Sequence, residues 1–307
     1  MSYQLETTAL ISKDNYNAFR IRCIMLILGN LNFILNILCE TNYNSLTKIN
    51  VFYMSNIYHY TSFETFQKII ETKTIRLNSL KNVDDLEEGV LLDTQNQAPY
   101  TFVSCWTKKP DESIPLWSMY VESPFAIRIE ISSDFLEPIF FKKYFIENHK
   151  NRNAYVFLMH RGNKGTEFLS DIVYKEQPLI QMYKNLRGMV TDEYIETYGI
   201  SKRTQWNFQE EIRFVVQAVP ISQIRTRSDA SLYTLCQEII INNDPTNIEY
   251  IDMEYNIDLM LTAHLMLGPS TTKQDEEILK TYINEKLPEF RGTISRSKAY
   301  IKKPIRG

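Results

Sequence analysis

Short runs in which apolar and polar residues alternate recur from residue 56 to residue 267 and predict β-strands. Each run is rich in β-branched or aromatic residues, which pack well on a pleated, half-buried surface. The predicted strands are Asn56–Tyr60, Thr74–Asn78, Thr101–Trp106, Phe125–Ile131, Ile139–Ile146, Glu211–Val219, Tyr250–Met253 and His264–Leu267.

Helical spacing of apolar residues interrupts these strands. Ser62–Lys73 places Phe63, Phe66, Ile69 and Ile70 on one face of a predicted helix. Lys273–Lys286 is a second amphipathic helix, and residues 153–199 are also predicted to be helical. Strands and helices do not alternate strictly, and no glycine-rich strand–helix turn is present, which disfavours a doubly wound fold. We predict an α+β fold with a mainly antiparallel, sandwiched sheet.

The first 53 residues are predicted to be a separate helical extension, followed by one main domain over residues 54–307. The apolar run Ile21–Cys39 is interrupted by Arg22 and three asparagines, so it falls short of the roughly 18 apolar residues that a membrane span requires. It also begins late for a signal peptide. A buried or amphipathic helix is favoured, and stable membrane insertion is not expected.

Composition narrows the function classes. The net charge of −3 and the pI near 5.9 argue against a general binder of nucleic-acid backbones, although a local basic groove stays open. The four cysteines are scattered with no Cys-x-x-Cys pair, which predicts neither a metal site nor a disulfide framework. Free thiols in a reducing cytoplasm are the expectation.

The segment "QWNFQEEIRFVVQAV", residues 205–219, carries the most unusual pattern. On a strand, Gln209, Glu211 and Arg213 share one face, and Val215 continues that face. The strand therefore enters a core and leaves its polar end at a rim or cleft. An ordinary salt bridge on an edge strand is the alternative interpretation.

Two further segments carry candidate chemistry. In "PLWSMYV", residues 115–121, Trp117 and Tyr120 lie on one face of a predicted helix, either as core residues or as the wall of a pocket for a flat ring. The strand Asn56–Tyr60 ends in His-Tyr-Thr, where His59 is by default a core histidine. Thr61 and Glu64 form a predicted capping box at the next helix. The acidic loop Lys81–Gly89 is interpreted as a solvated turn rather than a metal site.

The order of these blocks resembles a known family. "HYT", "TIRLNSL", "VDDLEEG", "FVSCWTKKPDESIPLWSMY", "WNFQEEIRF" and "LMLGPS" are similar to the widespread bacterial family of unknown function catalogued as domain DUF2971. The resemblance covers roughly residues 55–290. Asp84 and Gln209 depart from the family pattern, which usually has Asn and an acidic residue at these positions.

That family in turn resembles the ADP-ribosyltransferase superfamily, which implies a split β-sandwich with flanking helices and NAD as substrate. Block by block, the resemblance implies that His59 holds the ribose of NAD, Tyr120 lies against the nicotinamide, and Glu211 is the catalytic carboxylate. The remaining residues implied to bind NAD are Tyr60, Thr61, Trp117, Ser118, Gln209 and Arg213.

The function implied is an NAD-dependent mono-ADP-ribosyltransferase-like enzyme, a bacterial toxin or phage-defence effector located in the cytoplasm. An NAD glycohydrolase and a non-catalytic binding module of the same fold are the alternatives. The acceptor, a protein or a nucleic acid, is expected to contact the turn near residues 195–209 through Lys202, Arg203, Gln205 and Trp206, and the alternative is that this turn is plain surface. An antitoxin or another partner protein is also expected.

Overall fold

A computed structural model describes residues 55–85, 87–89, 97–136, 141–142, 145–146, 153–159, 161, 167–177, 196–224 and 232–299. All of them belong to the second of the two units into which the chain divides, Met1–Tyr53 and Met54–Gly307. The predicted helical extension over residues 1–53, with its apolar run, lies outside the described residues. None of the described helices combines the length and the apolar character that a membrane crossing requires.

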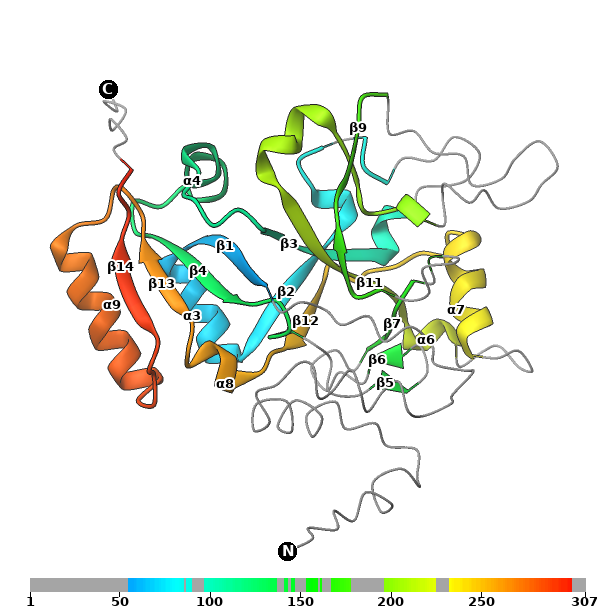
Figure 1. Ribbon diagram of the computed structural model, residues 1–307. Helices are drawn as coiled ribbons and strands as arrows, with labels where there is room; N and C mark the ends of the chain where they lie inside the picture. Colours follow the sequence, from blue (N-terminus) through cyan, green and yellow to red (C-terminus); the bar gives the residue numbers. More distant parts are fainter. Residues whose placement is uncertain are drawn as a thin grey trace, which may run out of the picture. The chain divides into compact units, whose positions relative to one another are not determined.

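A large sheet dominates the described part of the chain (Figure 1). Its strand order is β14-β13-β4-β1-β3-β11-β7-β6-β5, with β2 and β12 branching from β3, and β8 pairing with β11. Every registered pair in it is antiparallel except β13 with β14. The strands are β1 Asn56–Ser62, β2 Thr74–Ser79, β3 Thr101–Thr107, β4 Ala126–Ser132, β5 Phe141–Lys142, β6 Phe145–Ile146, β7 Ala154–Phe157, β8 Leu169–Asp171, β11 Glu211–Pro220, β12 Tyr250–Glu254, β13 His264–Leu267 and β14 Thr293–Arg296.

The prediction of a mixed fold with a mainly antiparallel sheet is confirmed. A separate parallel pair joins β9, Val173–Lys175, to β10, Ser201–Arg203. The helices are α3 Phe63–Thr72, α4 Ile114–Tyr120, α6 Ile221–Ile224, α7 Leu232–Ile241, α8 Ile257–Met260 and α9 Lys273–Lys286, with short 3₁₀ turns η2 Leu80–Asn82, η3 Ala98–Tyr100 and η5 Thr204–Gln209.

The helix α3 turns its four predicted apolar side chains, Phe63, Phe66, Ile69 and Ile70, into the core. Phe63 stacks on Phe125 with ring centroids 4.2 Å apart, and Tyr282 of α9 packs edge-on against Phe63 at 5.5 Å. These contacts attach α3 and α9 to the β1–β4–β13 part of the sheet. At the other end, α7 buries Leu235, Cys236 and Ile239 in a second cluster with Val219 of β11.

The sheet branches along β3. One edge of β3 pairs with β11 over its whole length, from Thr101 opposite Gln217 to Thr107 opposite Glu211. The other edge is shared: β2 pairs at Phe102 and Val103, whereas β1 pairs only at Thr107. Residues 104–106 therefore have no registered partner on this edge among the described strands, and β1 and β2 diverge around them.

Three predicted elements are wrong. The helix after β1 is capped by Ser62, whose Oγ accepts from the Thr65 amide, so Thr61 lies in the strand and forms no capping box. The predicted strand Ile139–Ile146 contains two short antiparallel strands instead, β5 and β6. The predicted helix over residues 153–199 contains β7, β8 and β9, while residues 178–195 lie outside the described part. The segments "AYVF" and "LSDIVYK" contain β-branched and aromatic residues, which favour strands there.

Candidate functional site

A cavity of about 510 Å³ opens where β1 and β2 diverge from β3. Three of the residues that line it are His59 of β1, Tyr120 of α4 and Glu211 of β11, which come from segments far apart in the sequence. Tyr60, Gln209 and Arg213 also line it. The structure therefore brings most of the predicted site residues to one cleft. Residues of α3, β2 and β3 complete the walls, among them Lys68, Arg76, Ser104 and Trp106.

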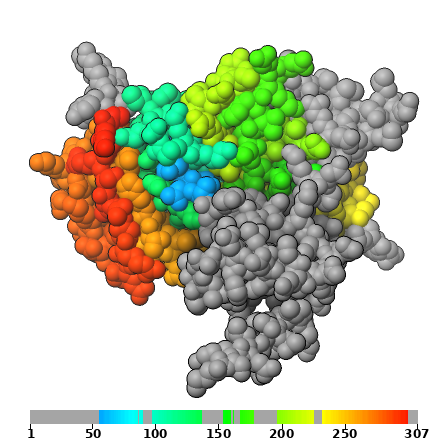
Figure 2. Space-filling model, in the orientation of Figure 1, coloured from blue at the N-terminus to red at the C-terminus, as the bar shows by residue number. Residues whose placement is uncertain are grey.

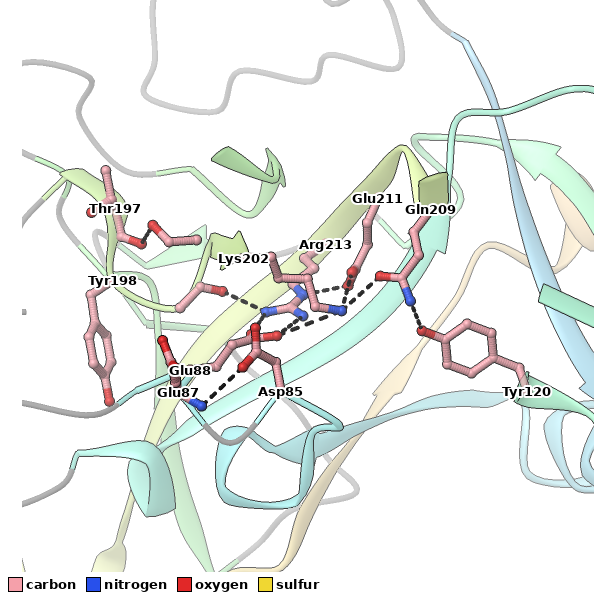
Figure 3. A network of polar contacts seen from close by, with 12 residues as sticks. Asp85, Glu87, Glu88, Tyr120, Thr197, Tyr198, Lys202, Gln209, Glu211 and Arg213 are labelled. Carbon is pink, nitrogen blue, oxygen red and sulfur yellow. Dashed lines mark hydrogen bonds and ion pairs between the residues drawn. The ribbon is translucent and has the colours of Figure 1, made fainter. Parts of the chain in front are cut away.

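A cluster of four charged side chains lies at one wall of this cleft (Figure 3). Three of them, Lys202, Glu211 and Arg213, line the cavity, and the fourth, Glu88, pairs with Arg213. We call Glu88, Lys202, Glu211 and Arg213 the buried quartet. Each of the four is between 0% and 6% exposed. Arg213 Nε donates to Glu211 Oε1 at 2.6 Å, and its two terminal nitrogens both donate to the carboxylate of Glu88, one of them at 3.0 Å. Lys202 Nζ donates to Glu211 Oε2 at 2.8 Å and lies 3.6 Å from Glu88.

The buried quartet balances two negative charges with two positive charges. Burial alone would raise the pKa of Glu211, but Arg213 and Lys202 outweigh it and lower that pKa to about 2. The same carboxylates raise the pKa of Arg213 against the opposing effect of burial. Glu211 is therefore ionised at neutral pH. The Cys105 thiol also helps to lower the pKa of Glu211, and burial raises the pKa of that thiol.

A sharp turn at Glu210 assembles the polar end of β11. Gln209 ends the 3₁₀ turn η5, and Glu210 has φ +43° and ψ +50°, the left-handed conformation. The prediction that Gln209 belongs to the strand is wrong for this reason. The turn nevertheless brings the side chains of Gln209 and Glu211 to the same cation, Lys202, because Lys202 Nζ also donates to Gln209 Oε1 at 2.8 Å. Glu210 itself is exposed and pairs with Lys109 at 3.4 Å.

Tyr120 is joined to this wall through Gln209, whose Nε2 donates to the Tyr120 hydroxyl at 2.6 Å (Figure 3). The pKa of Tyr120 lies well above its ordinary value because of burial first and the charge of Glu211 second. Tyr120 is thus a neutral hydroxyl with an aromatic ring at the cleft.

His59 occupies the gap in the sheet. Its Nδ1 lies 3.2 Å from the carbonyl oxygen of Cys105, one of the β3 residues without a strand partner on that edge. A carbonyl only accepts, so Nδ1 carries the proton, and burial holds the pKa of His59 below its ordinary value. The neutral ring then presents Nε2 as an acceptor. Its ring also packs on Trp106 at 4.7 Å.

Three predicted NAD-binding residues lie outside the cavity lining. Trp117 is 3% exposed and packs edge-on against Tyr60 at 4.6 Å, while its Nε1 donates to Glu112. It is a core residue, packed in a cluster with Tyr60, Leu116, Val121 and Ala126, whereas Tyr120, one turn further along α4, lines the cleft. Ser118 is exposed on the same helix, and Thr61 is buried within β1.

Lys202 and Glu88 were not predicted as members of the site. Lys202 was expected to contact an acceptor, but it is 2% exposed and points into the buried quartet. Arg203 pairs with Glu87 at 3.2 Å, whereas Gln205 is exposed. The acidic loop supplies Glu88 as a counter-charge rather than as part of a solvated turn. The signal was present, because an unpaired arginine in an apolar strand needs carboxylates from elsewhere in the chain.

No group of three or more metal-ligating side chains occurs among the described residues. Comparisons of the chain with family models, with curated proteins and with solved structures each return no match.

Proposed function

We propose that this chain is an NAD-dependent mono-ADP-ribosyltransferase-like enzyme of the DUF2971 type that cleaves the bond between nicotinamide and ribose. One observation carries the proposal: His59, Tyr120 and Glu211, from three separate segments, line one cavity. Its volume of about 510 Å³ is in the range of small-molecule and cofactor sites. The divergence of β1 and β2 along β3 supports a split-sheet, ADP-ribosyltransferase-like architecture.

The proposed reaction breaks the C1′–N bond, and the electron pair leaves with the nicotinamide as a neutral ring. Positive charge builds on the ribose, as in the oxocarbenium-like transition state of glycoside hydrolysis. An ionised carboxylate beside the ribose stabilises that charge, and the low pKa of Glu211 keeps it ionised. The acceptor adds at C1′ and loses its proton, which completes the transfer.

The ion pairs of Glu211 are compatible with this role. A carboxylate has about four acceptor sites, and Arg213 and Lys202 each occupy one of them. Acceptor capacity is therefore left for a ribose hydroxyl. Arg213 and Lys202 then hold the carboxylate in place before the substrate arrives, which is the preorganisation that electrostatic catalysis requires.

Nicotinamide release tests the proposal. Purified protein with NAD and a cell lysate should release nicotinamide, and Glu211→Gln should reduce the rate about 100-fold. Glu210→Gln is the matched control, because it makes the same chemical change at the exposed neighbouring residue and should leave the rate unchanged. Equal rates for wild type and Glu211→Gln would contradict a catalytic role of this carboxylate.

The fate of the ribose separates transfer from hydrolysis. Label from NAD that is radioactive in its adenylate part should appear on a protein or nucleic acid of the lysate. Release of all the label as free ADP-ribose assigns an NAD glycohydrolase instead, with water as the acceptor.

A second candidate function is a non-catalytic binding module with the same cleft. It is favoured by the ion pairing of both Glu211 oxygens and by the 4% exposure of this residue. Binding of NAD with no nicotinamide release from wild type would assign this function.

A further inference from the structure

Lys202 determines which atoms of Gln209 donate and which accept hydrogen bonds. A lysine ammonium only donates, so the Gln209 atom 2.8 Å from Lys202 Nζ must be the amide oxygen. The amide nitrogen of Gln209 then faces Tyr120 and donates to its hydroxyl oxygen at 2.6 Å. This bond uses an acceptor site of the Tyr120 oxygen and leaves the phenolic proton for another group. No described residue accepts that proton.

The other two predicted catalytic residues, His59 and Glu211, offer hydrogen-bond acceptors to the cleft, whereas Tyr120 offers a donor. The His59 ring donates from Nδ1 to the Cys105 carbonyl, so the neutral imidazole offers Nε2 as an acceptor. The carboxylate of Glu211 accepts only, and it is ionised. The three predicted catalytic residues therefore present two acceptors, His59 and Glu211, and one neutral donor, Tyr120, on walls of the same cavity.

We infer that the cleft selects its ligand by this arrangement of hydrogen-bond donors and acceptors. The ligand class is an N-ribosylated aromatic ring that carries a carbonyl: ribose hydroxyls donate to His59 and Glu211, and the carbonyl oxygen accepts from Tyr120. Tyr120 is then a specificity-determining hydrogen-bond donor in addition to an aromatic wall, and Gln209 sets its direction. A carboxylate at position 209 would accept the Tyr120 proton and remove the donor. The inference rests on the proposed function.

Three dinucleotides test it: NAD, its 3-acetylpyridine analogue, which keeps the carbonyl, and its 3-aminopyridine analogue, which lacks it. Dissociation constants are measured by stopped-flow tryptophan fluorescence before turnover. Wild type should bind NAD and the acetyl analogue alike and the amino analogue about tenfold more weakly, the effect expected for the loss of one hydrogen bond. Tyr120→Phe and Gln209→Glu should each weaken binding of the first two ligands about tenfold and leave the third nearly unchanged.

The controls separate this inference from the proposed catalysis. Tyr233→Phe removes a hydroxyl on α7, outside the cavity lining, and should change no dissociation constant. Equal affinity for all three dinucleotides, with no effect of Tyr120→Phe, would overturn the inference. The expected discrimination without any nicotinamide release supports the inference and contradicts only the catalysis. No binding of any dinucleotide to wild type contradicts both.

Discussion

Two clusters of this chain each contain two carboxylates and two cations, in opposite surroundings. The surface quartet consists of Glu276, Glu277, Lys280 and Arg296, on α9 and β14. Lys280 lies 2.8 Å from Glu276, and Arg296 lies 2.6 Å from the same carboxylate. Figure 2 shows α9 and β14, in orange and red, side by side at the surface. Side chains of the surface quartet are 24% to 72% exposed, whereas those of the buried quartet are at most 3% exposed.

The distances in the two clusters are similar, but the energetics differ. Exposed ion pairs are screened by water and contribute little to stability. Buried pairs cost several kcal/mol of desolvation per ion, and apolar residues of similar volume often stabilise a fold as well or better. Packing alone therefore gives no reason for four charges on the wall of a cleft. This contrast supports a functional role for the buried quartet, with Glu211 facing the cavity and its three partners fixing its position.

The largest difference is expected when one cation is removed from each cluster. Arg213→Met leaves Glu88 and Glu211 buried with Lys202 alone, and should lower the free energy of unfolding by about 3–5 kcal/mol. Urea denaturation of wild type and variant measures this loss. If Glu88→Met is added to Arg213→Met, part of the loss should return, since one buried carboxylate is removed with its partner. A loss below about 1 kcal/mol for Arg213→Met would show that the quartet is hydrated in solution.

Lowering the pH should reduce the unfolding free energy that the buried quartet contributes by a comparable amount, and that of the surface quartet much less. The folded state lowers the pKa of Glu211 from 4.5 to about 2. A group with a lowered pKa stabilises the fold above its unfolded pKa, so this contribution is complete above about pH 4.5 and is lost as the pH falls toward 2. Roughly 3 kcal/mol of unfolding free energy should disappear over that interval.

This prediction is checked by comparing how the stability of wild type and of two variants depends on pH. Stability of Glu211→Gln should fall less steeply between about pH 4.5 and 2 than stability of wild type. Hydrogen bonds from Lys280 and Arg296 lower the pKa of Glu276 as well, but water screens this partly exposed carboxylate, so Glu276→Gln should depart from the wild-type curve much less than Glu211→Gln. Parallel curves for wild type and Glu211→Gln would mean that the carboxylate at position 211 titrates normally.

A smaller effect is expected at the turn that the buried quartet requires and the surface quartet does not. Glu210 has φ +43°, where a β-branched side chain is strained. Glu210→Val should cost about 1–2 kcal/mol in urea denaturation, whereas Glu210→Gly should cost nothing or stabilise slightly. Equal stability of the valine and glycine variants would show that this backbone conformation is not maintained in solution.

The smallest effect is expected for Arg296→Met, the surface counterpart of Arg213→Met. Water replaces the lost partner of Glu276, so the melting temperature should shift by no more than about 2 °C. Added salt should reduce even that shift, because exposed charges are screened. A shift as large as that of Arg213→Met would remove the distinction between the clusters.

The sequence predicted most of the sheet, because strands such as β1, β3 and β11 combine alternation with β-branched and aromatic residues. It failed over residues 153–199, where the described strands have at most four residues and no long apolar period. Short strands take their conformation from their partners, here β11 for β7 and β8, and that information is not local.

For the site, the strand period placed Glu211 and Arg213 on one face, and their shared contacts agree with it. The partners Glu88 and Lys202 lie 125 and 11 residues from Arg213 in the sequence, and only the fold brings them together. The direction of the His59 and Gln209 hydrogen bonds likewise depends on the Cys105 carbonyl and the Lys202 ammonium. The sequence predicts which side chains line this cleft, but not which of them donate hydrogen bonds and which accept them.

In the proposed function, Glu211 acts on the ribose of NAD held in this cleft. A crystal structure of Glu211→Gln with NAD, which this variant should bind without cleaving, shows whether it does. We predict the nicotinamide against Tyr120 and a ribose hydroxyl within hydrogen-bond distance of residue 211, with His59 on the same sugar. NAD bound elsewhere on the protein, or absent from the cleft at saturating concentration, would contradict the proposed function.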